Sequence, residues 1–133
     1  MRRAIQRNLT LACGAFLIST LGCGPKAEPG GRDYTVRAQV VQPPSETTGL
    51  YLYHEAIDDW VGRDGKVEGM DTMAMPFPVA QDVPLEGLQA NDKVEVKLHV
   101  NWTSDKPVEI REIQKLPPDT KLEFRAARPP KNP

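Results

Sequence analysis

The sequence predicts an all-β protein that folds as a small five-stranded barrel. Apolar and polar residues alternate with a period of two in several segments, and no segment keeps a helical period over three turns. These segments lie within roughly 85 residues, between two ends that are rich in glycine and proline. Five short strands in a chain of this length suit a closed or partly open barrel, because closure removes exposed sheet edges.

The five strands are expected at separate places along the chain. The alternation covers residues 34–40, 50–53, 94–102 and 108–112, and a short strand is expected at residues 74–79. In the fourth of these segments, Val108, Ile110 and Glu112 share one face, and Ile113 breaks the alternation. Asp64-Gly65 is typical of a type I′ hairpin turn, so residues 58–69 are expected to form a small hairpin or ordered loop.

The N-terminal 22 residues resemble a bacterial lipoprotein signal peptide. They combine a basic start with an apolar run too short to span a membrane, and they end at Thr20-Leu21-Gly22-Cys23, which resembles a lipobox. Lipidated Cys23 would tether the mature protein to a membrane surface that faces the periplasm. The alternative is an ordinary secretory signal that is cleaved elsewhere.

The remaining chain divides into three parts. Residues 23–32 form a flexible linker, residues 33–116 form the barrel, and residues 117–133 form a proline-rich tail. We expect this tail to be disordered, with Leu122 and Phe124 as the first residues that pack back on the barrel.

The net charge restricts the class of partner, and the cysteine content restricts the side chains that could bind a metal. Loss of the signal peptide leaves 14 basic and 18 acidic residues, a net charge of −4, which disfavours a nucleic-acid partner. Cys13 leaves with the signal peptide, and Cys23 would carry the lipid. The mature chain then has no free thiol, so a metal site must use histidine, methionine, carboxylate or aromatic side chains.

The methionines point to a soft metal ion. Apart from the initiator, all of them lie between Met70 and Met75. Methionines often fill irregular gaps in a core, but these stand beside glycine, aspartate, threonine and proline, which indicate a turn. Met73 and Met75 are two residues apart, so on a strand they share a face. Thioethers are soft ligands that favour Cu(I) over magnesium, calcium or manganese.

Other residues near this cluster complete the prediction. His54 has the parity of Leu50 and Leu52, so it is expected to point inward, whereas His99 is expected to face solvent. Pro76 and Pro78 remove donors from one side of their strand, so this strand is expected to pair fully on its other side only.

These residues resemble the CusF-like family of periplasmic copper-binding proteins. The resemblance covers residues 34–116 and rests on His54-Glu55-Ala56-Ile57, Met73-Ala74-Met75-Pro76-Phe77, and Gly87 followed by Asn91-Asp92-Lys93-Val94. It implies a five-stranded OB-like barrel, and it implies that His54, Met73 and Met75 are the metal ligands.

The chain departs from the family pattern in two places. The loop between His54 and Met73 is longer, and Met70 stands where the best-known members carry a tryptophan that covers the metal by a cation–π contact. A His-Met-Met-Met site is one interpretation. Trp60 could cover the ion instead, although aromatic residues more often serve in packing.

The resulting hypothesis is a monomeric carrier of one Cu(I) or Ag(I) ion in copper homeostasis, resistance or delivery. Its partners would be the membrane, through the lipid, and transiently a copper efflux or cuproenzyme-assembly protein. The alternative is a metal-free OB-like module that binds a protein or glycan. A blue-copper redox site would need a cysteine thiolate, and the sequence shows no recognisable catalytic arrangement, so we do not expect an enzyme.

Overall fold

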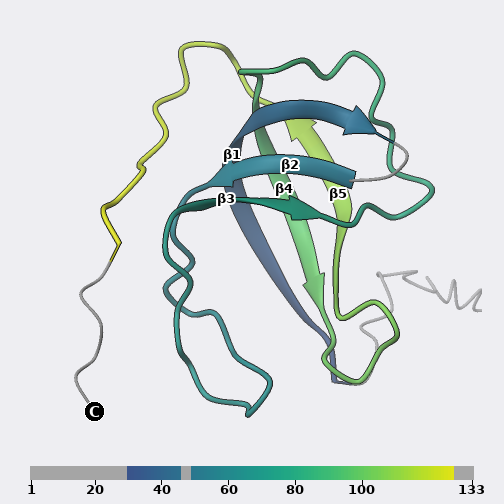
Figure 1. The fold of residues 1–133 in the computed structure, drawn as a ribbon, viewed down its shortest axis with the longest axis vertical. Coiled ribbons are helices and arrows are strands. Elements are labelled where there is room, and N and C mark those ends of the chain that lie inside the picture. Colours follow the sequence, from purple (N-terminus) through teal and green to yellow (C-terminus); the bar gives the residue numbers. More distant parts are fainter. Residues whose placement is uncertain (1–29, 46–48, 128–133) are drawn as a thin grey trace, which may run out of the picture.

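The computed structural model describes residues 30–45 and 49–127 (Figure 1). The predicted signal peptide, Cys23 and the start of the linker lie outside these residues, as does the end of the tail. Five strands are present: β1 (Arg32–Ser45), β2 (Gly49–His54), β3 (Met73–Phe77), β4 (Lys93–Val100) and β5 (Val108–Lys115). In the part of the chain that is described, no helix has the length and apolar character needed to cross a membrane.

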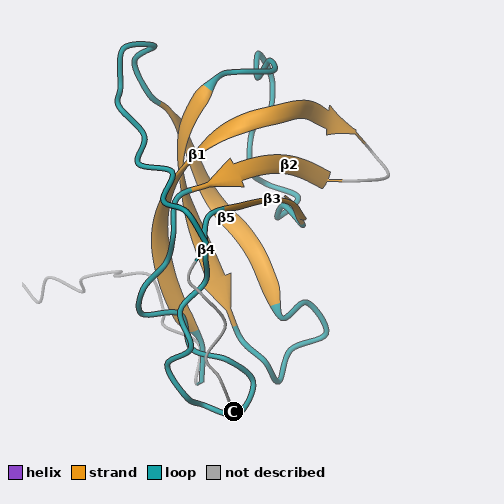
Figure 2. Ribbon diagram, turned by 60° about the vertical axis from the view of Figure 1, so that its left-hand side comes forward, coloured by secondary structure: helices purple, strands orange, loops and turns teal. Residues whose placement is uncertain are grey.

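The strands form one antiparallel sheet in the order β3-β2-β1-β4-β5, which closes on itself. Closure occurs just after β3, where Val79 forms a parallel bridge with Ile110 of β5. The Ile110 amide donates to the Pro78 carbonyl, and the Ala80 amide donates to the Ile110 carbonyl. This ring of strands is the arrangement of a small OB-like barrel, which confirms the predicted fold class. Figure 2 shows the strands curving around a common interior.

β1 is long because it pairs with two strands, β4 and β2, along different parts of its length. Its first part pairs with β4, from Arg32 opposite Val100 to Gln39 opposite Lys93, and its second part pairs with β2. Two register shifts after Val40, within the part that pairs with β2, bend the end of the strand. The inward side chains form one core with those of the other strands: Tyr34, Val36, Ala38, Val40, Leu50, Leu52, Phe77, Val94, Val96, Leu98, Val100 and Ile110.

The prediction for β5 is wrong at one position. Glu112 does not share the inner face with Ile110, because a register shift between Lys97 and Leu98 leaves Arg111 as an extra residue in β5. Glu112 therefore lies opposite Lys97, and their side chains form an ion pair at 2.7 Å. The same shift returns Ile113 to the core side, opposite Val96, which explains the break in the sequence alternation.

The predicted hairpin between β2 and β3 is present, but its turn type differs. Val61 and Val67 pair across it, and the Gly65 amide donates to the Gly62 carbonyl at 3.0 Å. A type I′ turn needs positive φ at both central residues. Gly65 has φ of 78°, but among the described residues Asn91 is the only non-glycine with positive φ, so Asp64 does not. The turn is a longer loop that ends in a glycine bulge.

The described part of the tail, residues 117–127, has no strand or helix but follows the barrel surface (Figure 1). The Phe124 ring lies 4.2 Å from the Tyr53 ring, centroid to centroid, so the expectation that Phe124 packs back is confirmed. To residue 127 the tail is therefore attached to the barrel, which corrects the expectation of a fully disordered tail.

Candidate metal site

The end of β2 and the start of β3 bring the predicted ligands together. His54 is paired with Met73 across the two strands, and Leu52 is paired with Met75. Paired residues on antiparallel strands share a face, with Cβ atoms about 4.5–5.5 Å apart, and diagonal neighbours remain within reach of long side chains. The register therefore places His54, Met73 and Met75 on one face, the face that also carries buried Leu50 and Leu52.

Met70 approaches from the returning arm of the hairpin. It pairs with Ile57, and each residue's amide donates to the other's carbonyl at 2.8 Å. This pair continues the β2–β3 ladder beyond His54 and Met73. The hairpin thus brings Met70 back beside the strand ends, as the four-ligand interpretation requires.

Exposure along β3 rises from the core towards the strand start. Phe77 is fully buried, Met75 is half-buried and Met73 is 44% exposed. Met70 and Met75 pack against the core, so core packing accounts for part of their burial. It does not account for Met73, a large apolar side chain that faces solvent.

β3 has an open side at this point. Within the described residues its ladder is with β2, and the hydrogen bonds to β5 begin only beyond the strand, at Pro78 and Val79. This agrees with the one-sided pairing predicted from the prolines. The methionine end of β3 is therefore hydrogen-bonded to a strand on one side only, among the described residues.

The His54 imidazole is buried and held by one hydrogen bond. Its Nδ1 lies 2.7 Å from the backbone carbonyl oxygen of Glu55. A carbonyl only accepts, so in the neutral ring Nδ1 carries the proton and Nε2 carries the free lone pair. Nε2 is buried and has no hydrogen-bond partner in the described part of the chain. Burial lowers the pKa of His54 below its ordinary value, against a smaller opposite effect of the Glu55 hydrogen bond.

This arrangement fits a metal ligand. Histidines that bind metals commonly donate one ring N–H to a carbonyl or carboxylate, which fixes the tautomer and aims the other nitrogen at the ion. The His54 side chain lies on the same face as Met73 and Met75, and burial favours the neutral ring, as coordination requires. No cluster of three or more histidine, cysteine, aspartate or glutamate side chains suited to a metal occurs among the described residues. The donors available at this place are thioethers and one imidazole.

Trp60 lies apart from this face. Its ring is buried, 5.1 Å from the Tyr34 ring and 5.9 Å from the Trp102 ring, centroid to centroid. The Tyr34 hydroxyl accepts from the Val61 amide and the Trp102 indole donates to the Val61 carbonyl, both at 3.0 Å. These contacts pack Trp60 and the hairpin onto the barrel, which is the role that the packing interpretation gives it.

His99 is buried, so the expectation that it faces solvent is wrong. The ring is 5% exposed, and its Nδ1 lies 2.7 Å from a carboxylate oxygen of Asp33. The backbone of Gly31 covers it, since a Cβ added there would meet the ring at 2.3 Å. Strand parity placed His99 correctly outside the core, but a glycine far away in the sequence buries it.

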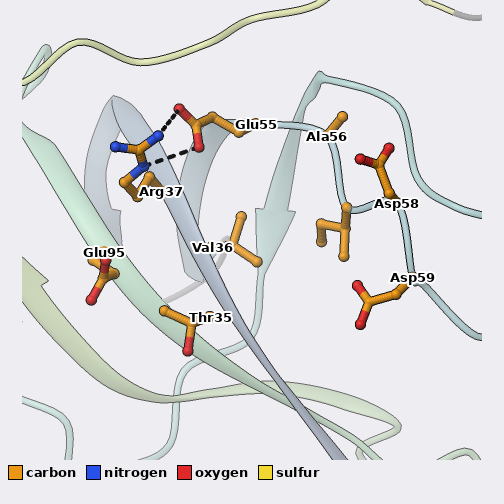
Figure 3. Close-up of a pocket in the computed structure, with 9 residues that line it drawn as sticks. Thr35, Val36, Arg37, Glu55, Ala56, Asp58, Asp59 and Glu95 are labelled. Atoms are coloured by element: carbon orange, nitrogen blue, oxygen red, sulfur yellow. Dashed lines mark hydrogen bonds and ion pairs between the residues drawn. The ribbon is translucent and has the colours of Figure 1, made fainter.

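Glu55 is the residue of this region that the sequence did not reveal. Its amide donates to the Arg37 carbonyl, its carbonyl accepts from His54, and its carboxylate makes two hydrogen bonds of 3.1 Å with Arg37. A hydrogen bond that a backbone carbonyl accepts leaves no signal in a sequence. Figure 3 shows the Arg37–Glu55 pair in a pocket of about 370 Å³ that also includes Asp58, Asp59 and Glu95. This polar pocket contains neither His54 nor a methionine, so it is separate from the candidate site.

Comparison with known proteins gives little beyond the fold. No family model and no curated protein matches the chain. A solved structure of apo-CusF, residues 6–88, from Escherichia coli matches with 13% identity and a TM-score of 0.48, covering 71% of this chain and 99% of that one. A likeness this distant carries no argument about function, which must come from the residues themselves.

Proposed function

We propose that this protein binds one Cu(I) or Ag(I) ion through His54 Nε2 and the thioethers of Met73 and Met75, with Met70 as a fourth donor. The protein would act as a metal carrier rather than an enzyme. The single observation that supports this most directly is the buried Nε2 of His54, which has no hydrogen-bond partner in the described chain and lies across the ladder from Met73.

The free energy of burial supports this assignment. A buried polar atom without a partner costs about 1–3 kcal/mol, because it loses its hydrogen bonds to water. A metal ion at Nε2 would offset this cost by taking the lone pair. An apolar partner surface would not, because it offers no donor to the lone pair.

The kind of ion follows from the donors. Thioether sulfur is soft and uncharged, and a set of thioethers with one imidazole suits a soft monovalent ion better than a hard divalent one. The mature chain would contain no thiolate, so the site would not compete with disulfide formation in an oxidising compartment.

The open side of β3 supports a carrier. Met73 is exposed at the start of the strand, whereas His54 is buried behind it. An ion could therefore reach the site, and leave it, past Met73. We further propose that lipidated Cys23 holds the protein in the bacterial cell envelope, where it would exchange metal with an efflux or cuproenzyme-assembly protein.

A competition assay with a Cu(I) chelator tests the proposed site in the full chain, purified in detergent. We expect one Cu(I) per chain, and at least about a 100-fold loss of affinity, about 2.8 kcal/mol, when Met73 and Met75 are both changed to leucine. Leucine has nearly the same volume as methionine, so the barrel should remain folded. His54→Gln should also weaken binding, and Met70→Leu should weaken it less.

The other histidine offers a matched control. His99→Asn also removes a buried imidazole, but one bound to Asp33 on the outer face, so it should leave Cu(I) affinity unchanged. If the folded wild-type protein fails to retain Cu(I) or Ag(I), the carrier proposal is wrong. The metal-free binding module is then the better hypothesis.

A further inference from the structure

The C-terminal segment returns from β5 to the site region along the barrel surface. The Leu116 amide donates to the Lys93 carbonyl at 2.8 Å, and the Lys93 ammonium donates to the carbonyls of Pro118 and Thr120. These bonds fix the course of the segment at its start. It then reaches the end of β2 with Glu123, Phe124 and Arg125, which we call the C-terminal strap.

The first two strap residues contact the neighbours of His54 on both sides. Phe124 packs on Tyr53, with 4.2 Å between the ring centroids, and the Glu123 amide donates to the Glu55 carboxylate at 2.6 Å. Tyr53 precedes His54 and Glu55 follows it. The strap thus lies against the outer side of the short segment whose inner side presents the imidazole.

Glu55 links the strap directly to the imidazole. Its carboxylate is held by Arg37 on β1 and by the Glu123 amide, and its backbone carbonyl accepts from His54 Nδ1. A shift of Glu55 would therefore move the carbonyl that fixes the His54 tautomer. Such second-layer contacts orient metal ligands, and their loss commonly lowers affinity 10- to 100-fold.

The third strap residue contacts the hairpin beside Met70. The Arg125 guanidinium lies 2.6 Å from a carboxylate oxygen of Asp58, in the outgoing arm. Arg125, Asp58 and Asp71 also line one small cavity of about 90 Å³, so the strap reaches both arms. Asp58 follows Ile57 and Asp71 follows Met70, and Ile57 and Met70 are the pair that holds the arms together.

From these contacts we infer that the C-terminal strap is a positioning element, which holds His54 and Met70 in the geometry for metal binding. This inference rests on the proposed function. The strap does not contribute a donor to the ion. It holds His54 at the end of β2 and Met70 in the hairpin. Less conformational entropy is then lost when the ion binds.

The strap is suited to mutation because it contributes little to the barrel core. The Arg125–Asp58 pair is exposed on both sides, and exposed ion pairs add little to stability. Phe124 is half-buried on the surface ring of Tyr53 rather than in the core cluster. Strap variants should therefore fold, with an effect confined to the site.

The test combines Phe124→Ala with Arg125→Ala in the full chain, purified in detergent. We expect Cu(I) affinity to fall about 10- to 100-fold, with little change in the urea midpoint of unfolding. In the metal-free protein, the ¹⁵N signals of the His54 ring should change from one tautomer with the proton on Nδ1 to a mixture. The conservative pair Phe124→Tyr with Arg125→Lys should restore both. Lys121→Ala, an exposed residue of the same segment, should change neither.

The outcomes separate this inference from the proposed function. If the wild type binds no Cu(I), the proposed function fails, and the His54 ring signals still decide whether the strap holds the imidazole. If the double variant keeps both the affinity and the ring signals of the wild type, the strap inference is overturned. An equal loss of affinity in a Met70→Leu background, with unchanged ring signals, overturns it as well, because the effect then acts through neither His54 nor Met70.

Discussion

His54 combines burial with a fixed orientation, and the proposed metal site requires both properties. Many buried histidines satisfy both ring nitrogens within the protein. Here the backbone carbonyl of Glu55 accepts from Nδ1, Nε2 has no partner among the described residues, and the residue shares a face with Met73 and Met75. The ring is therefore prepared as a neutral donor before any ion arrives.

Burial gives His54 a testable effect on stability. It lowers the pKa of the folded protein's His54 below the ordinary value near 6.5, with the Glu55 hydrogen bond as a smaller opposing influence. In the unfolded chain the imidazole takes up a proton near that ordinary value, so the unfolded state binds more protons as the pH falls. The free energy of unfolding should therefore decrease as the pH falls below about 6.5, by at most about 1.4 kcal/mol per unit for this group. The loss stops once the pH is below the lowered folded-state pKa.

Urea unfolding of the metal-free protein between about pH 8 and about pH 5 measures this effect. His54→Gln should remove this part of the pH dependence, so the quantity of interest is the difference between the two curves. The rest of the chain is the same in both proteins, so its contribution cancels in this difference. Parallel curves for wild type and variant over the whole range would show that burial of His54 does not affect its protonation.

Strand parity predicted the side of the sheet on which each histidine lies, because alternation is a local property of the chain. It placed His54 inside correctly. It could not predict that His99 is buried, because the cover comes from Gly31, which reaches the ring through the pairing of β1 with β4. Exposure on an outer face depends on distant backbone, and the sequence pattern carries no local signal for it.

At the scale of the element, Gly49 fixes how β2 starts against β3. Its φ is 66°, and a Cβ added there would lie 2.6 Å from the carbonyl oxygen of Phe77. Leu50 pairs with Phe77, at the opposite end of the same ladder that places Met73 opposite His54. The glycine thus allows the close approach on which the register of the site depends.

We expect Gly49→Ala to destabilise the protein by at least about 2 kcal/mol, since it combines left-handed backbone with a clash against main chain. Gly65→Ala is the matched control: its φ is 78°, but an added Cβ would meet no atom within 4 Å. That change should cost only about 1 kcal/mol, from the backbone conformation alone. Urea unfolding measures both values. Equal losses would mean that the contact with Phe77 does not restrict residue 49.

The element boundaries were predicted well where alternation is regular and poorly where an extra residue interrupts it. Arg111 is such a residue, and it moves Glu112 from the expected inner face to the outer face. The break at Ile113 was visible in the sequence, but its cause was not, because a bulge is defined by the partner strand. Asp64-Gly65 similarly marked a turn without fixing its type, since the register of Val61 and Val67 sets the loop length.

At the scale of the whole molecule, the barrel and the strap place the site at one open side of the closed sheet. The number and order of short strands made a small barrel predictable, and packing of Phe124 on the barrel was also expected. The path of the strap past Glu55 and Asp58 was not, because these contacts join residues 67 and 68 positions apart. Long-range contacts between exposed polar groups leave no periodic pattern in a sequence.

In the proposed function, the position of the whole molecule in the cell would depend on Cys23, which lies outside the described residues. Gly30, the first described residue, follows it by seven positions, and seven residues reach at most about 25 Å. A lipid on Cys23 would thus keep the barrel close to the membrane surface. Stable anchoring needs more than one acyl chain, because each buried CH₂ contributes only about 0.8 kcal/mol.

We expect the wild-type protein to incorporate labelled fatty acid in bacterial cells and to lose its first 22 residues. Cys23→Ala should abolish the label and leave the longer precursor, because the residue that carries the lipid is missing. Cys13→Ala is the matched control, since Cys13 lies in the apolar run that leaves with the signal peptide, and it should behave as the wild type. Gel mobility and fatty-acid label together decide the matter. Label retained in Cys23→Ala, or absent from the wild type, would favour an ordinary secretory signal and a carrier that is free to diffuse.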